Sequence, residues 1–135
     1  MLKYNLISRK NPITKEYAFH ASLTPVVPIR MNALAQEVSS NCTVTAHDIK
    51  AVVSALEEQI YKMLRNGQSI RLGDLGSFHP TIQSRGAASE EEFTKENIRG
   101  VKVRFVPSSK MRYEMALNNP NMSIVRNVPE ATDEE

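Results

Sequence analysis

Three histidines and one cysteine are the side chains of this sequence that could carry nucleophilic catalysis or bind a transition metal. His20 and His79 lie far from the others, and only His47 falls within a few residues of Cys42. A catalytic thiol–imidazole pair needs the two groups within hydrogen-bond reach and a third group that orients the base. His47 lies in the first turn of a predicted helix, where we expect a solvent-facing or capping role. One cysteine also allows no internal disulfide and no metal site built from cysteines.

The acidic and glycine-containing motifs are equally poor candidates for a metal or cofactor site. The run Glu90–Glu92 has no companion pattern of alternating Asp or Asn with a glycine, which a calcium loop would need. Gly73 and Gly76 are not followed by Lys-Ser or Lys-Thr, so they predict a tight turn and not a phosphate-binding loop. We therefore expect no enzyme activity, no catalytic residue, no metal, no cofactor and no small-molecule substrate.

The distribution of charge is more informative than its total. The formal net charge is only +2, which is too small to identify a nucleic-acid-binding protein. Residues 1–30 nevertheless carry five cations against one carboxylate, and residues 101–118 carry four against one. Residues 90–100 and the C-terminal end are acidic. This segregation indicates two basic patches.

Length and composition favour a single folded domain with appendages. The chain has 135 residues, with 41% apolar and 24% charged residues, close to the averages of soluble globular proteins. No window approaches eighteen uninterrupted apolar residues, and the first ten residues lack a signal-peptide core. We expect a cytoplasmic protein without membrane contact.

The first third of the chain predicts a β-hairpin followed by a connector. Alternating stretches over 2–8 and 16–23 predict two strands, which flank the turn-forming pair Asn11-Pro12. Two prolines make residues 24–29 an extended connector.

Helical periodicity begins after Arg30 and predicts a short helix, then a long helix over 45–66. Thr45 and the aspartate three residues later resemble a capping box, and Gly67 supplies the C-terminal cap. The long helix carries a broad apolar stripe, which invites dimerisation. The stripe comprises Ile49, Val52, Val53, Leu56, Ile60, Met63 and Leu64.

Period-two alternation predicts three further strands, over 69–72, 78–84 and 101–106. The last of them has Lys102 and Arg104 on its solvent face. Pro107 ends this strand.

A short helix follows, capped by Ser108 or Ser109 and reaching about Leu117. Residues 119–135 predict a flexible acidic tail. We therefore divide the chain into an N-terminal β-hairpin extension at 1–29, a main domain at 30–118 and the tail.

This order of elements resembles the HU/IHF family of bacterial histone-like DNA-binding proteins over roughly residues 30–118. The stretch from Arg71 to Phe78 is similar to the family's Gly-aromatic-Gly-Thr-Phe turn, with Leu75 in the aromatic position. Residues 103–112 are similar to the family's Phe-Lys-Pro-Gly-Lys entry into its last helix. The N-terminal extension, the glutamate-rich segment and the acidic tail together resemble an HU-related branch known from Bacteroidetes.

The resemblance implies both a fold and a function. The fold is α+β: an intertwined HU-like homodimer with a helical base, a three-stranded antiparallel sheet per chain and a short C-terminal helix, here with the N-terminal hairpin added. The function is architectural, largely sequence-independent binding and condensation of double-stranded DNA in the bacterial nucleoid, with β-arms that reach around the minor groove. The residues implied to bind phosphates are Arg71, Arg85, Arg99, Lys102, Arg104, Ser109, Lys110 and Arg112.

The sequence departs from the family in the arm, residues 85–100. The family's arm is basic and ends in Arg-Asn-Pro, whereas this arm lacks proline and carries Glu90–Glu92. Phosphates repel an anionic tip, so either the arm folds back as a short helix from Ser89 or DNA binding is weaker and without bending. The residues Arg9-Lys10-Asn11-Pro12 are similar to the missing tip, which makes Pro12 a candidate wedge.

These departures from the family favour a second possible function. The acidic arm, the low net charge and the N-terminal extension fit an HU-like dimer that serves as a protein-interaction or scaffold module. Such a module would bind DNA weakly or not at all, so a DNA titration separates the two hypotheses.

Overall fold

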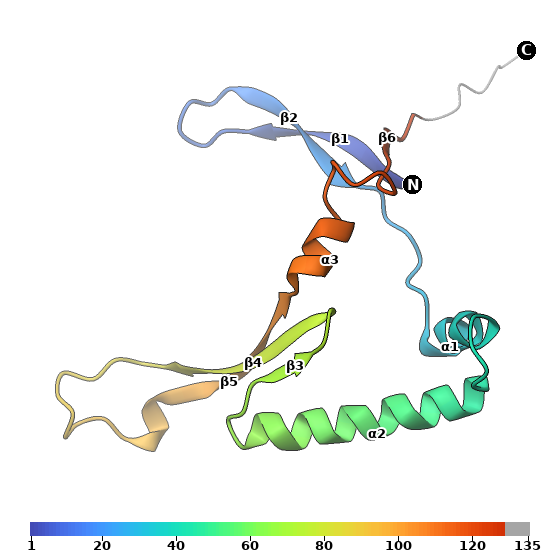
Figure 1. The fold of residues 1–135 in the computed structure, drawn as a ribbon. Helices are drawn as coiled ribbons and strands as arrows, with labels where there is room; N and C mark the ends of the chain where they lie inside the picture. The colour runs from blue at the N-terminus through green and yellow to red at the C-terminus, as the bar shows by residue number, and fades with distance from the viewer. Residues whose placement is uncertain (129–135) are drawn as a thin grey trace, which may run out of the picture. The chain divides into compact units, whose positions relative to one another are not determined.

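The structure, a computed structural model, describes residues 1–128 and has an α+β fold (Figure 1). The chain divides into two compact units. One comprises residues 29–112, and the other combines residues 1–28 with the segment that begins at Tyr113. The elements in chain order are β1 (Leu2–Lys10), β2 (Tyr17–Leu23), α1 (Met31–Ser40), α2 (Ala46–Arg65), β3 (Ile70–Leu72), β4 (Gly76–Ser84), the 3₁₀ helix η1 (Lys95–Asn97), β5 (Ile98–Pro107), α3 (Ser109–Glu114) and β6 (Ile124–Arg126).

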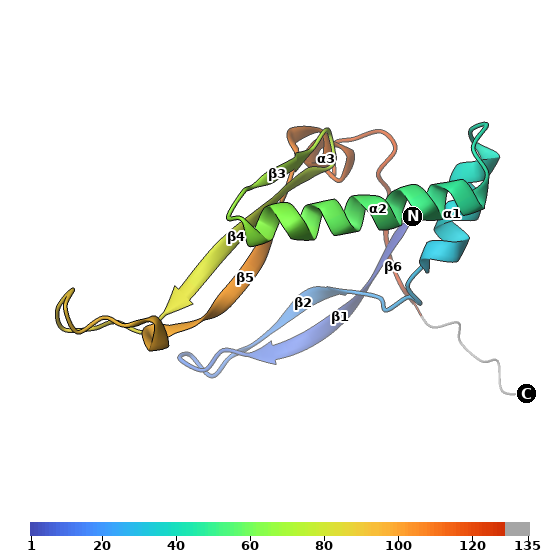
Figure 2. The ribbon, with the colours of Figure 1, turned by 90° about the horizontal axis from the view of Figure 1, so that it is seen from below.

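The helices α1 and α2 form a helical hairpin, and α2 has the predicted residues at both of its ends. Thr45 is the N-cap of α2, and its hydroxyl accepts a hydrogen bond from the Asp48 amide at 3.2 Å. The same hydroxyl donates to the Asp48 carboxylate at 2.8 Å, and this hydrogen bond holds the Thr45 side chain in its capping position. Gly67 has a φ of 76°, which a glycine adopts at no steric cost. Figure 2 shows α1 beside the N-terminal end of α2.

The sheet of the 29–112 unit is antiparallel with strand order β3-β4-β5. Because β3 has only three residues, it pairs with the first three residues of β4. The remainder of β4 and β5 therefore continues as a two-stranded ribbon (Figure 1). Gly76 is required where β4 begins, since a Cβ there would collide with the Val106 carbonyl and lie 2.7 Å from the Phe105 ring.

Of the two alternatives for the arm, the short helix from Ser89 does not form, because the arm makes separate turns. The Ser89 hydroxyl accepts from the Glu92 amide at 3.2 Å, and the Phe93 amide donates to the Glu90 carbonyl at 3.2 Å. Thr94 then caps η1 and starts a new, tighter turn. Each turn closes its own short-range hydrogen bond, and no continuous helix runs through the arm.

The last helix is shorter than predicted. Ser108, and not Ser109, is its N-cap, because the Ser108 hydroxyl accepts from the Met111 amide at 3.0 Å. α3 ends at Glu114 instead of near Leu117. The backbone then continues in turns whose hydrogen bonds join residues three positions apart; the Ala116 amide, for example, donates to the Tyr113 carbonyl at 3.1 Å. The side chain of Asn119, only 3% exposed, also donates to the Tyr113 carbonyl at 3.1 Å, which completes the end of the helix.

The expectation of a flexible tail is wrong for residues 119–128. β6 pairs in parallel with β1, with Leu2 opposite Ile124, and completes a sheet of order β2-β1-β6. Its residues Ile124 and Val125 are β-branched and suit the open edge of β1. The acidic residues at the end of the predicted tail, Glu130, Asp133, Glu134 and Glu135, lie outside the described residues.

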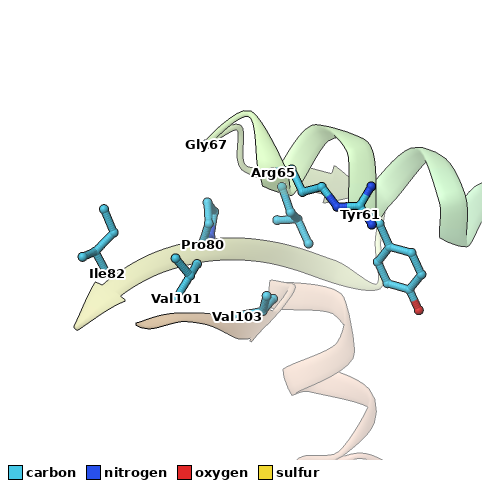
Figure 3. Close-up of a pocket in the computed structure, with 8 residues that line it drawn as sticks. Tyr61, Arg65, Gly67, Pro80, Ile82, Val101 and Val103 are labelled. Carbon is cyan, nitrogen blue, oxygen red and sulfur yellow. The ribbon is translucent and has the colours of Figure 1, made fainter. Parts of the chain in front are cut away.

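The 29–112 unit leaves its apolar faces uncovered in a single chain. Within residues 1–128, Ala35 and Ala46 are the only buried hydrophobic residues. On the stripe of α2, Val52 is 65% and Leu56 is 44% exposed. A cavity of about 630 Å³ opens between the C-terminal end of α2 and the apolar face of the ribbon (Figure 3). It is lined by Tyr61, Leu64, Arg65, Gly67, Pro80, Ile82, Val101 and Val103.

Among the helices of the described chain, none is long and apolar enough to cross a membrane.

Candidate nucleic-acid interface

The face of the ribbon opposite the apolar cavity carries the predicted row of cations. The pairs Pro80–Val103 and Ile82–Val101 point their side chains into the cavity. Since side chains alternate between faces, the neighbouring residues Lys102 and Arg104 lie on the opposite face. Lys102 pairs with Thr81 and Arg104 pairs with His79, and both cations are exposed.

Arg71 joins this row through β3. It pairs with Ser77, two residues before His79 on β4, so Arg71 shares the face of Arg104 and Lys102. Arg71 is also exposed. We call these three residues the basic face.

A polar hollow of about 430 Å³ lies at one end of the basic face. It forms where the turn between β3 and β4 meets the start of α3. The Ser108 hydroxyl donates to the Asp74 carbonyl, and the Ser108 amide donates to the Leu75 carbonyl at 3.1 Å, which fixes this meeting point. The hollow brings together four of the predicted site residues: Arg71, Ser109, Lys110 and Arg112.

The cations of this region are nearly free of internal partners. Lys110 Nζ lies 3.9 Å from Asp74 Oδ2, the one ion pair within residues 1–128, and both side chains are mostly exposed. An exposed pair at this distance contributes about 0–1 kcal/mol and opens readily. The hollow and the basic face can therefore exchange solvent and counterions for phosphates.

Arg85 and Arg99 lie at the other end of the ribbon, away from the hollow. The Arg85 amide donates to the Asn97 carbonyl at 2.7 Å, which closes the base of the arm. The pairing steps from Gln83–Gly100 to Ser84–Ile98, so Arg99 has no residue opposite it and forms a β-bulge. A bulge redirects its side chain relative to the regular alternation. Both arginines are exposed, but the structure does not bring them to the hollow.

Pro12 belongs to the other compact unit, at the tip of the β1–β2 hairpin. The Asn11 side chain accepts from the Ile13 amide at 2.9 Å, which makes the tip a defined turn. Ile13, beside Pro12, is 89% exposed. The tip thus presents apolar side chains next to the cations Lys10 and Lys15.

The comparison with known families identifies the chain. The family described as HU-HIG, "HU domain fused to wHTH, Ig, or Glycine-rich motif", matches residues 1–119. The chain belongs to the HU-HIG family. This confirms the predicted resemblance to HU proteins. It also places the N-terminal hairpin of this HU-HIG chain inside the region that the family shares.

A crystal structure from Bacteroides vulgatus ATCC 8482 is similar to the HU-HIG chain. The protein in that structure is provisionally described as a bacterial DNA-binding protein. The TM-score is 0.66 at 16% sequence identity, and the match covers 95% of this chain and 50% of the other. At that identity the likeness shows the fold alone, and this HU-HIG chain spans half the length of that structure. No curated protein sequence matches the chain.

One polar residue of the candidate interface, His79, was not predicted from the sequence. His79 lies beside Arg104 on the basic face, and its two ring nitrogens are each 2.9 Å from a hydroxyl, of Ser69 and of Ser77. The alternation of Ser77, His79, Thr81 and Gln83 along β4 was the available signal, since it marks a continuous polar face. Within residues 1–128, no group of three or more potential metal ligands occurs.

Proposed function

We propose that this HU-HIG chain is a non-enzymatic architectural protein that binds double-stranded DNA in the bacterial nucleoid, largely irrespective of sequence. The observation that carries the proposal is the hollow, where Arg71, Lys110 and Arg112 gather next to exposed Lys102 and Arg104. Cations on a strand face suit the regularly spaced phosphates of a duplex. The name of the similar Bacteroides vulgatus structure supports the same reading.

The proposed contacts explain why binding would be largely independent of sequence. Lysine, arginine and serine side chains at the hollow are suited to phosphate oxygens, which carry no base information. Arg85 and Arg99 extend the same chemistry to the base of the arm. The acidic turn of the arm, where Glu90 is exposed, favours binding without deep insertion of the arm into a groove.

We propose further that the active form is a homodimer whose helices form a shared base. The support is the apolar surface that the single chain leaves open: the stripe of α2 and the cavity beneath the ribbon. Each Å² of apolar surface removed from water contributes about 25 cal/mol. A second copy that covers both surfaces would supply the core that one chain lacks.

A titration of duplex DNA at two salt concentrations tests the function. We expect a dissociation constant in the micromolar range or below at about 50 mM salt, weakening by at least about a hundredfold at about 200 mM, because bound phosphates release counterions. Fluorescence anisotropy with two unrelated duplexes checks both the salt response and the independence of sequence. Absence of binding at low salt would overturn the proposal and leave the scaffold function, which the exposed Glu90–Glu92 turn favours.

The hairpin tip gives a separate prediction about bending. If Pro12 is a wedge, Pro12→Ala should lower the DNA bend angle while affinity changes little, because the neighbouring cations remain. Fluorescence energy transfer between dyes at the two ends of a duplex measures the angle. Pro28→Ala, in the connector, is the matched control. An unchanged bend in Pro12→Ala would remove this residue from the interface.

A further inference from the structure

The outer edge of β2 is unpaired within residues 1–128. At the two ends of the β1–β2 ladder, the Thr24 amide donates to the Lys3 carbonyl at 2.9 Å and the Asn11 amide donates to the Glu16 carbonyl at 2.8 Å. Because bonded and non-bonded pairs alternate along an antiparallel ladder, the even-numbered residues of β2 bond to β1. The backbone groups of the odd-numbered residues therefore point outward: Tyr17, Phe19, Ala21 and Leu23.

This edge lacks the features that usually protect an edge strand. Natural sheets discourage pairing with lysines, prolines, bulges or very short strands. β2 is seven residues long, contains no Lys, Arg, Asp, Glu or Pro, and pairs with β1 without a register shift. Three of its outward-bonding residues are also large and apolar, with Tyr17 70%, Phe19 73% and Leu23 60% exposed.

We propose that β2 pairs with β2 of a second copy, antiparallel and centred on His20. In this register Tyr17 lies opposite the partner's Leu23, and Phe19 lies opposite the partner's Ala21. All outward amides and carbonyls of both strands are then satisfied. Each aromatic ring meets an aliphatic or small side chain on the same face, a favourable cross-strand combination.

The charges of the hairpin support the antiparallel arrangement. Lys10 and Lys15 lie at the loop end of the hairpin, and Arg9 directly precedes Lys10 on β1. Antiparallel pairing sends the two loops to opposite ends of the joined strands, whereas parallel pairing would place the cations of both loops side by side. Self-association through an uncharged strand also distinguishes this edge from the basic face, which suits a polyanion.

This contact lies in the unit that contains residues 1–28 and uses none of the apolar surfaces of residues 29–112. Its consequence rests on the proposed function: where residues 29–112 form the homodimer, β2 pairing joins one homodimer to the next and holds two duplexes together. A chain with two different self-associating surfaces forms assemblies larger than a dimer.

Disulfide trapping tests the register in the full chain, with Cys42→Ser in every variant because Cys42 is exposed. His20→Cys places two cysteines directly opposite each other, about 4.5 Å apart at Cα, within the range of a disulfide. Ala18→Cys, on the same face, is the control: four residues separate it from its own copy along the strand, roughly 13 Å. We expect an intermolecular disulfide in His20→Cys and at least about tenfold less in Ala18→Cys. No disulfide, or equal yields, would overturn the pairing.

Sedimentation of a second pair of variants tests whether the contact joins dimers. Ala21→Pro removes an outward amide but no hydrogen bond to β1, since Ala21 and Leu6 are a non-bonded pair. Ala21→Thr keeps the amide. We expect Ala21→Thr and the unaltered chain to sediment as species larger than a dimer and Ala21→Pro to sediment as a dimer; identical sizes would overturn the linkage. DNA affinity measured on the same samples should not change, so failure of this inference and failure of the proposed function can be told apart.

Discussion

Simultaneous replacement of Lys102 and Arg104 by glutamate is expected to abolish duplex binding while the protein remains folded. Both side chains are exposed on the face opposite the apolar cavity, so neither contributes to packing. The change turns attraction to phosphates into repulsion at two positions per chain. Each replaced side chain should reduce the binding free energy by about 1 kcal/mol or more near a solvated surface. In a dimer this amounts to a loss of about a thousandfold or more in affinity.

Anisotropy titration measures the loss, and thermal unfolding followed by circular dichroism checks the fold. Lys3→Glu with Lys62→Glu is the matched control, since it makes the same change in net charge on β1 and α2. That control should lose far less affinity. Equal losses would mean that only net charge matters, and an intact affinity in the first variant would mean that the basic face is not the DNA-binding surface.

Truncation of Phe105, which forms an aromatic pair with Phe78 across β4 and β5, is expected to have the largest effect on stability. Phe78 and Phe105 have ring centroids 5.2 Å apart, at 50° to each other. Removing a core phenylalanine costs about 3–5 kcal/mol. Phe105 is 43% exposed in one chain, so the full cost applies where a second copy covers the ring. Phe105→Ala should therefore weaken the dimer as well as the fold.

Urea unfolding at two protein concentrations separates these contributions, because only a dimer becomes less stable on dilution. Phe93→Ala is the matched control: Phe93 is 40% exposed, similar to Phe105, but it lies in the turns of the arm. We expect a small, concentration-independent change in that variant. A loss in Phe105→Ala that is equally small and independent of concentration would contradict a dimer core on this face.

The parts of the fold that depend on near neighbours could be predicted from the sequence. The Thr45 cap, Gly67, the hairpin turn at Asn11-Pro12 and the alternation of β4 and β5 are set by residues a few positions apart. The strand β6 could not be predicted, because three residues carry no periodic signal and their partner is β1, more than 120 positions away. The early end of α3 likewise depends on the side chain of Asn119.

The same distinction applies to the candidate site. Alternation alone was enough to place Lys102 and Arg104 on one face of a strand. The hollow was not predictable as a unit, because it needs Ser108 to contact Asp74 and Leu75, more than thirty residues earlier. Arg99 is displaced by a bulge, which leaves no mark in the sequence pattern. His79 could have been found from the polar alternation of β4.

The pairing of β6 with β1 has a consequence for biosynthesis. A ribosome makes β1 about 120 residues before β6, so one side of β1 stays unsatisfied until translation has passed Arg126. The match to the HU-HIG family ends at residue 119, before β6. Premature termination or proteolytic cleavage at that point would leave β1 exposed on this side as well as β2 on the other, and such a fragment should aggregate more readily than the full chain.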